Sequence, residues 1–466
     1  MIPFVANAQL RNLPDEFLEW INSKGMNHAT VSLEIAKISS PDTPPEIIYS
    51  HDNQRSVQPA STMKLLTTAT ALSKLDNNDK IKTEVYYSGS IVNGVLNGDL
   101  IITGYGNAML SSSRSNFPKD AFANSISMSL RKEGITRIDG NIIGDGTLLT
   151  QSPIPSEWTW EDMGNHYAQS ISGLNYEDNA YEIVLNTSRK GIKPTVVKIE
   201  PNVDDIEIDN QLLSIDYAFD SAYVFGAPYQ NKRTILGAVP HRLPQYKVKG
   251  DVPDPAQFAA SRVKTQLEGY GVSISGKALS NKNRIDYSTK HLLYTHYSES
   301  IAFLAKQTNV FSINLMAEML LRQLSLKYGD GSETDGINVI QNFLLENSLD
   351  LDGIRIFDGC GLAPADRVTT DFIVSLLNKM KTNDNFVNSL AIAGKTGTVY
   401  SFLKNTRLEG KAKLKTGTTK AVIAYSGYVE GSDGHTYAIS FIVNNHSAKS
   451  AIVRKNIEKM FLLLIP

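Results

Sequence analysis

The sequence predicts an α/β (α+β) fold that is interrupted by inserted domains. The C-terminal part has the order strand, strand, strand, helix over residues 412–418, 422–430, 436–444 and 449–464, which is typical of a sheet covered by a helix. The middle of the chain has a different pattern, in which turn dipeptides such as Asn93-Gly94 separate short predicted strands. A length of 466 residues fits two to four domains, or one domain with large insertions.

Before the middle of the chain we expect a helix, two strands, a second helix and a set of short strands, at residues 14–23, 29–38, 46–49, 61–75, 82–87 and 91–103. A helix around Phe122 to Leu130 then ends at Gly134 and leads into a strand over 136–143. The same order returns later in the chain, in a helix over 256–267 and a strand over 272–279. We therefore expect one inserted domain, which a smaller strand-rich domain interrupts.

Helical periodicity returns after residue 298, and Ser312 and Asn314 fall at a break between two apolar helix faces. A Gly-rich loop follows at residues 358–362, and then a helix at 371–380. The last helix ends in the apolar run Phe461 to Ile465. That run leaves peripheral membrane association open, but the short mixed polar face favours a helix packed on a sheet.

Composition excludes several classes of function. A net charge of −2 without a basic tract gives no reason to expect nucleic acid as a partner. The single cysteine, Cys360, excludes an internal disulfide and any multi-cysteine zinc site. The histidines show no metal-binding spacing, so we expect no metal and no cofactor. No stretch approaches the eighteen apolar residues of a membrane span.

The N-terminus resembles the tail of a secretory signal. Ile2-Pro3-Phe4-Val5 is followed by Ala6-Asn7-Ala8, a small-x-small pattern of the kind that precedes signal cleavage. An ordinary apolar N-terminus fits these residues equally well. The first alternative predicts an exported protein whose signal is truncated or removed.

Ser61 and Lys64 are three residues apart at the start of the second helix, so their side chains lie on one side of it. A hydroxyl becomes a nucleophile when a neighbouring base takes its proton, and a neutral amine one turn away is such a base. The pattern is short, however, and a capping serine beside a solvated lysine would give it too. The rest of the chain has to supply the other parts of a site.

Two further motifs supply them: Ser312-Ile313-Asn314 and Lys415-Thr416-Gly417-Thr418. Ser-x-x-Lys, Ser-Asp-Asn and Lys-Thr-Gly form the known motif set of penicillin-recognising serine enzymes. Ser312 can relay a proton from Lys64 to a leaving nitrogen, and Asn314 can hold Lys64 and a substrate carbonyl. Alone, Ser312 and Asn314 would suit a capping pair between helices.

The third motif is expected on a strand. Lys415 and the Thr416 hydroxyl suit a terminal carboxylate, and Gly417 lets a peptide approach the strand edge. The backbone N–H groups of Ser61 and Thr418 would bind the developing oxyanion.

The same four residues also occur at Lys395-Thr396-Gly397-Thr398. This first copy lacks strand signals, whereas the second copy follows an alternating segment and precedes an apolar strand. We therefore assign the function to the second copy.

With these motifs, the chain resembles the class C low-molecular-mass penicillin-binding proteins of penicillin-binding protein 4 type, which are the S13 peptidases. Longer local matches include residues 96–100, 140–145, 312–318, 358–362 and 415–418. The long gap between Lys64 and Ser312 is also typical of that family.

The resemblance implies a penicillin-recognising serine transpeptidase-like catalytic domain, with a mostly antiparallel sheet, flanking helices and two inserted domains. The expected boundaries are 9–80 with 285–466 for the catalytic domain, 81–180 with 250–284 for the second, and 181–249 for the third. It further implies D-alanyl-D-alanine carboxypeptidase and endopeptidase activity on peptidoglycan peptides, acylation by β-lactam antibiotics, and a periplasmic location.

Two positions concern the recognition of a diaminopimelate side chain. Asp145 matches the family's aspartate in the inserted domain, whereas Pro364 stands where the family has an arginine. Arg367 is a candidate substitute. Ile313 replaces the usual aspartate of the second motif, at a side chain that is not the proton relay.

Three functions remain to be compared: a serine DD-peptidase, a β-lactamase or esterase of the same fold, and a non-catalytic peptidoglycan-binding protein. A β-lactamase needs an efficient deacylating base, often a glutamate, and the sequence offers no convincing candidate. A degenerate scaffold would be expected to lose at least one motif, and this chain keeps all three. We therefore expect a serine DD-peptidase.

Overall fold

The computed structural model describes residues 11–149, 152–216 and 221–466. The chain forms two compact units, divided at residues 78/79 and 300/301. The first unit combines both ends of the chain, and the second is the segment between them. The N-terminal signal expected at residues 2–8 lies outside the described residues.

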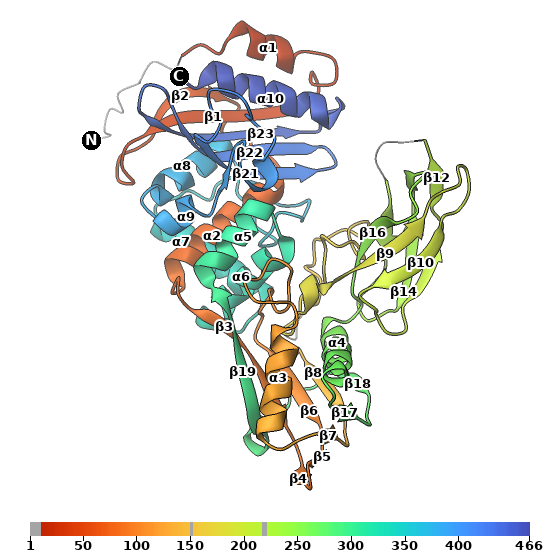
Figure 1. Ribbon diagram of the computed structural model, residues 1–466. Coiled ribbons are helices and arrows are strands. Elements are labelled where there is room, and N and C mark those ends of the chain that lie inside the picture. Colours follow the sequence, from red (N-terminus) through yellow and green to blue (C-terminus); the bar gives the residue numbers. More distant parts are fainter. Residues whose placement is uncertain (1–10, 150–151, 217–220) are drawn as a thin grey trace. The chain divides into compact units, whose positions relative to one another are not determined.

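The first unit is built on a six-stranded sheet with the order β2-β1-β23-β22-β21-β20, in which every neighbouring pair is antiparallel. The sheet joins the two ends of the chain, because β1 lies against β23 (Figure 1). Its strands are β1 (Thr30–Ile38), β2 (Glu46–His51), β20 (Ala391–Ile392), β21 (Ala412–Thr419), β22 (Val422–Glu430) and β23 (Thr436–Asn444).

Helices cover both faces of this sheet. Helices α1 and α10 lie on one face, and α8 on the other, with α2, α5 and α6 beyond it (Figure 1). The helices of this unit are α1 (Asp15–Ile21), α2 (Lys64–Lys74), α5 (Ile301–Phe311), α6 (Asn314–Tyr328), α7 (Glu333–Glu346), α8 (Thr370–Met380), α9 (Asp384–Val387) and α10 (Ser450–Leu464), with 3₁₀ turns η1 (Ala60–Met63) and η5 (Gly397–Val399).

The last helix packs on the sheet, as the sequence predicts. The side chains of Phe461 and Leu464 on α10 are buried in the same apolar core as the sheet residues Leu33 and Phe441. The favoured prediction of a helix packed on the sheet is therefore confirmed, and peripheral membrane association stays a prediction. Among the described residues, none of the helices has the length and apolar character needed to span a bilayer.

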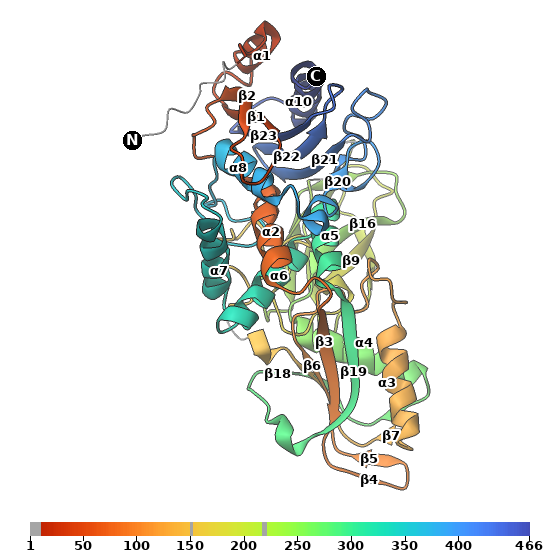
Figure 2. The same cartoon turned by 90° about the vertical axis from the view of Figure 1, so that its left-hand side faces the viewer.

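The second unit contains a five-stranded sheet, β18-β8-β6-β3-β19, and a four-stranded sheet, β17-β7-β5-β4. Helices α3 and α4 pack beside them (Figure 2). These elements are β3 (Lys80–Tyr87), β4 (Ser90–Val92), β5 (Val95–Asn97), β6 (Leu100–Gly104), α3 (Ala121–Lys132), β7 (Arg137–Ile138), β8 (Ile142–Asp145), α4 (Pro255–Gly269), β17 (Ser273–Ile274), β18 (Ala278–Asn281) and β19 (His291–Ser300), with 3₁₀ turns η2 (Thr147–Leu149), η3 (Glu177–Asn179) and η4 (Tyr287–Thr289).

Three smaller sheets, β10-β9-β16, β11-β14-β13 and β12-β15, form the strand-rich part of this unit. Their strands are β9 (Ala180–Asn186), β10 (Thr195–Glu200), β11 (Glu207–Asn210), β12 (Leu213–Ile215), β13 (Tyr223–Phe225), β14 (Lys232–Leu236), β15 (Ala238–Pro240) and β16 (Tyr246–Asp251). Strand β19, whose residues were expected in the catalytic domain, pairs with β3 in the second unit. The further division of this unit into residues 81–180 with 250–284 and residues 181–249 stays a prediction.

The two expected helix-to-strand segments of this unit are related, but each of their strands is divided in two. The strand expected over 136–143 forms β7 and β8 in different sheets, and the strand expected over 272–279 forms β17 and β18. The breaks fall at Gly140 and Gly276, where a Cβ atom would overlap the carbonyl oxygens of Gly98 and Gly140, respectively. The halves pair in parallel, β7 with β17 and β8 with β18.

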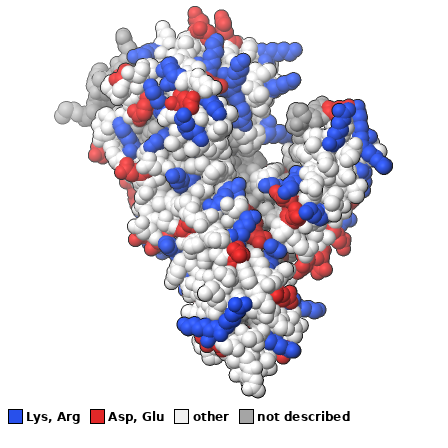
Figure 3. Space-filling model, viewed as in Figure 1, with Lys and Arg blue, Asp and Glu red and all other residues white. Residues whose placement is uncertain are grey.

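Charged side chains of both signs are interspersed over the face of the protein that Figure 3 shows. This pattern agrees with the near balance of 46 Lys and Arg against 48 Asp and Glu in the sequence.

Candidate active site

Ser61 lies in the 3₁₀ turn η1, which leads directly into α2. The predicted helix start is confirmed, although its first turn is 3₁₀. Two glycines enclose this turn: a Cβ on Gly361 would overlap the carbonyl oxygen of Ala60, and a Cβ on Gly417 would lie 2.6 Å from that of Pro59. Ala60 has a φ of +47°, which non-glycine residues adopt only where the surroundings fix it. The Ser61 hydroxyl is therefore held on a closely packed turn.

Lys64 lies one turn after Ser61, and its side chain is completely buried. Its Nζ lies 2.8 Å from Ser61 Oγ, 2.6 Å from Asn314 Oδ1 and 2.7 Å from the carbonyl oxygen of Cys360. Burial lowers the pKa of Lys64 below that of an ordinary lysine, against nearby acidic groups that raise it. The structure thus brings together the predicted nucleophile, base and amide, and burial disfavours the charged form of the lysine, as a general base requires.

Ser312 occupies the junction between α5 and α6, and Asn314 is the first residue of α6. The φ of Ser312 is +59°, so the chain turns sharply there and the helix dipole of α6 begins beside the site. Ser312 Oγ accepts a hydrogen bond from Lys415 Nζ at 2.8 Å. The second and third motifs are therefore in direct contact.

Lys415 to Thr418 lie on β21, which confirms the predicted strand. Lys415 is completely buried, and its Nζ also donates to the carbonyl oxygen of Thr416. Burial, and secondarily the charge of Lys64, hold the pKa of Lys415 well below its usual range. In the described part of the chain, β20 flanks β21 on one side and pairs with Lys413 and Leu414. Beyond Leu414, no strand of the described residues pairs with that edge of β21, and an unpaired strand edge is where an extended peptide can add.

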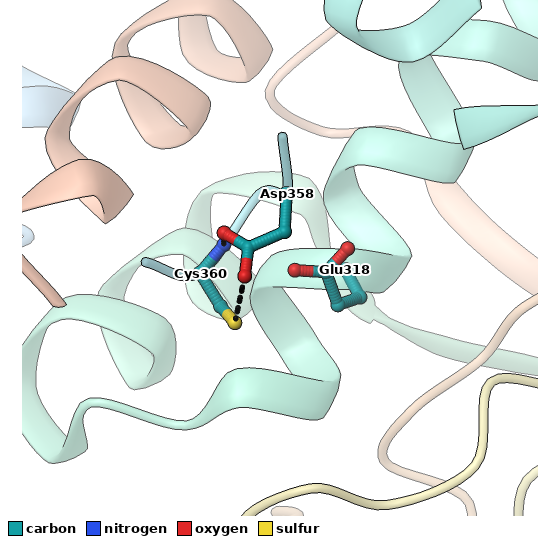
Figure 4. Close-up of side chains that lie close together, drawn as sticks. All are labelled: Glu318, Asp358 and Cys360. Carbon is teal, nitrogen blue, oxygen red and sulfur yellow. Dashed lines mark hydrogen bonds between the residues drawn. The ribbon is translucent and has the colours of Figure 1, made fainter. Parts of the chain in front are cut away.

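The Gly-rich loop is organised by Asp358 (Figure 4). Its carboxylate accepts four backbone N–H hydrogen bonds, at 2.5–3.0 Å, from Cys360, Gly361, Leu362 and Ala363. A carboxylate with this many donors fixes the path of the loop. The carbonyl oxygen that accepts from Lys64 is thereby also fixed in place.

Glu318 on α6 also contacts this loop: its Oε1 accepts a hydrogen bond from the N–H of Gly359 at 2.9 Å. Burial, with the negative charge of Asp358, raises the pKa of Glu318 to about 8. Side-chain ligand atoms of Glu318, Asp358 and Cys360 lie within 4.8 Å of one another (Figure 4). Because the Asp358 oxygens already accept from the loop, we assign this cluster to positioning the loop.

Known proteins with a similar sequence identify the family of this site. The sequence profile of the D-Ala-D-Ala carboxypeptidase 3 (S13) family matches residues 27–463. The chain belongs to this family. The predicted family, fold class and enzyme class are thus confirmed.

The relatives of this S13 protein are distant in sequence. A D-alanyl-D-alanine carboxypeptidase of Actinomadura sp. (strain R39) is 27% identical over 423 residues, covering 87% of this chain and 77% of that protein. The D-alanyl-D-alanine carboxypeptidase DacB of Haemophilus influenzae is 23% identical over 419 residues, covering 86% of this chain and 83% of that protein.

Solved structures show the same fold. The crystal structure of penicillin binding protein 4 from Haemophilus influenzae superimposes with a TM-score of 0.81 at 21% identity, covering 97% of this chain and 99% of that one. A predatory endopeptidase from Bdellovibrio bacteriovorus gives a TM-score of 0.52 at 14% identity, covering 94% and 93%.

Asp145 lies in the second unit of the S13 protein, at the end of β8. Its carboxylate is buried and accepts from Thr147 N at 2.9 Å, Asn281 Nδ2 at 3.3 Å and Tyr287 Oη at 2.5 Å. Its role in binding substrate stays a prediction. Arg367, in the first unit, donates to the carbonyl oxygens of Pro364 and Asp366 at 2.7 Å.

Sequence reasoning missed Thr398, which belongs to the first Lys-Thr-Gly-Thr copy. Thr416 donates a hydrogen bond to the Thr398 hydroxyl at 2.8 Å. The first copy is therefore a neighbour of the third motif, although its lysine is not. It also missed Arg454 on α10, whose Nη2 donates to Thr418 Oγ1 at 2.9 Å. The repeated motif could have drawn attention to Thr398; no local pattern marks Arg454.

Proposed function

We propose that this S13 carboxypeptidase cleaves the D-Ala-D-Ala bond of peptidoglycan stem peptides, and the related cross-links, through an acyl-enzyme on Ser61. The observation that carries this proposal is the position of Lys64 Nζ, which is buried and 2.8 Å from Ser61 Oγ. A neutral amine in this position can remove the hydroxyl proton as the oxygen attacks.

In the acylation step, Ser61 Oγ bonds to the carbonyl carbon while its proton passes to Lys64. The oxyanion of the tetrahedral intermediate accepts from the N–H groups of Ser61 and Thr418. Ser312, which Lys415 holds at 2.8 Å, relays a proton to the leaving amine, and the bond to that nitrogen breaks. Water then attacks the Ser61 ester, and the freed peptide leaves with a new carboxylate.

β-Lactam antibiotics are expected to acylate the same hydroxyl, because their strained amide presents a carbonyl to the same groups. Penicillin binding protein 4 from Haemophilus influenzae, whose fold this chain shares, has been crystallised in complex with a β-lactam. We also infer a periplasmic location, since the cross-linked peptides lie outside the cytoplasmic membrane.

The test is incubation of the protein and of Ser61→Ala with a labelled penicillin, followed by release of D-Ala from a D-Ala-D-Ala peptide. We expect a long-lived adduct and peptide hydrolysis in the wild-type protein and neither in the variant. Absence of an adduct in the wild-type protein would overturn the proposal. Rapid turnover of the penicillin would favour a β-lactamase, and an adduct without peptide hydrolysis would favour a binding protein. The location is tested by finding the adduct in a periplasmic extract rather than in the cytoplasm.

A further inference from the structure

Lys415 is a poor counter-charge for a substrate carboxylate. Its Nζ is buried and is occupied by Ser312 Oγ and by the carbonyl oxygen of Thr416. A carboxylate bound on the leaving side of the scissile bond therefore needs a cation from elsewhere.

The two threonines of the third motif point away from Lys415. Side chains alternate along a strand, so Thr416 and Thr418 share the face of β21 that carries Leu414. Leu414 belongs to the apolar core that α10 covers. This part of β21 therefore has two hydroxyls on the side of the sheet where the last helix lies. That of Thr416 is buried and donates to Thr398 Oγ1, and that of Thr418 is exposed.

Arg454 stands beside these hydroxyls. It comes from α10, and its guanidinium donates to Thr418 Oγ1 at 2.9 Å and to Tyr425 Oη at 3.3 Å. Among the described residues, Arg454 forms no ion pair with a carboxylate. Glu458, one turn further on, uses its Oε1 to accept the N–H of Leu403. Arg454 thus carries a permanent charge in a half-buried position, and its side-chain contacts among the described residues are hydroxyls rather than carboxylates.

We propose that Arg454 is a specificity residue that binds the carboxylate of the leaving residue, together with the exposed hydroxyl of Thr418. A guanidinium presents parallel N–H donors that match the two oxygens of a carboxylate. In a carboxypeptidase substrate, the carboxylate belongs to the residue that follows the scissile bond. Arg454 contacts Thr418, and the backbone N–H of Thr418 is the group assigned to the oxyanion, so the guanidinium lies close to that bond. This inference rests on the proposed function.

The test compares two substrates, a synthetic peptide that ends in D-Ala-D-Ala and the same peptide as its C-terminal amide. We expect the wild-type protein to prefer the free carboxylate. Arg454→Gln should lower kcat/KM for the carboxylate peptide about 10- to 100-fold, mainly through KM, and change that for the amide less than about threefold. Arg454→Lys should recover part of the preference.

Lys455→Ala is the matched control, because it removes a charge from the next, exposed position of the same helix. It should leave both substrates within about twofold of the wild-type values. Equal losses on the two substrates in Arg454→Gln, no preference in the wild-type protein, or an undiminished preference in both Arg454 variants would overturn the inference. Failure of the proposed function would look different, since the wild-type protein would then form no penicillin adduct and hydrolyse neither peptide.

Discussion

The two Lys-Thr-Gly-Thr segments of this chain have the same residues and different environments. Lys415 lies on β21 with no exposed surface, in contact with Ser312. Lys395 precedes a 3₁₀ turn, its side chain is 56% exposed, and it forms an ion pair with Glu409 at 2.6 Å. Burial and strand geometry, rather than the motif, give a lysine a low pKa and a place in the site.

The largest expected effect compares the two lysines. Lys415→Ala should lower the second-order rate constant of penicillin acylation by about 100-fold or more, because Ser312 loses the group that positions it. Lys395→Ala should leave that constant within about twofold of the wild-type value. A quenched time course of labelling with a fluorescent penicillin measures the rate constant of both variants. The reverse ranking would show that the first copy is the functional one.

The second prediction concerns pH. The neutral form of Lys64 is the active base, so the acylation rate should rise as pH increases through its pKa and then level off. Because burial lowers that pKa, the plateau should be reached at a lower pH than an ordinary lysine would give. Lys395→Ala should show the same profile. A rate that falls over this range would argue against a neutral lysine base.

The third prediction compares the glycines of the two copies. An alanine Cβ at 417 would lie 2.6 Å from the Pro59 carbonyl oxygen, so Gly417→Ala should shift the Ser61 turn and slow acylation about tenfold. At 397, where φ is +56°, the Cβ would overlap the Val310 carbonyl oxygen. Gly397→Ala should therefore lower the unfolding free energy by about 1–3 kcal/mol.

Thermal unfolding measures the effect at 397, and acylation of the folded fraction measures the effect at 417. The comparison fails if Gly397→Ala folds normally and loses acylation to the same degree as Gly417→Ala. That result would show that the first copy is part of the active site.

The smallest expected effect is on the surface ion pair. Lys395→Gln removes the charge that pairs with Glu409, and exposed pairs contribute little because water and salt screen them. The melting temperature should not change measurably at physiological salt. A clear decrease would mean that Lys395 supports the loop more than its exposure indicates.

The sequence was sufficient to predict those parts of the site that local patterns encode. The positions of Ser61 and Lys64 at a helix start, of Ser312 and Asn314 between helices and of Lys415 on a strand follow from periodicity and turn signals. The breaks at Gly140 and Gly276 could not be predicted in this way, because each depends on a backbone segment distant in sequence. Arg454 is hidden for the same reason, since its partner Thr418 lies on another element.

Glu318 is an intermediate case. It is a fully buried carboxyl on α6, a helix whose other residues in that stretch are apolar. A single acid on such a face is a detectable anomaly in the sequence. Its role became apparent only with the contact to Gly359.

The pairing of β1 with β23 has a consequence for the biosynthesis of this enzyme. Thr30 pairs with Asn444, and β21 is connected to β1 through β22 and β23. The ribosome therefore releases Ser61 and Lys64 long before the strands that complete their surroundings. Contacts between such distant segments form slowly. A nascent chain that has not yet released β23 should be unable to react with penicillin, so that the nucleophile becomes active only after β23 has joined the sheet.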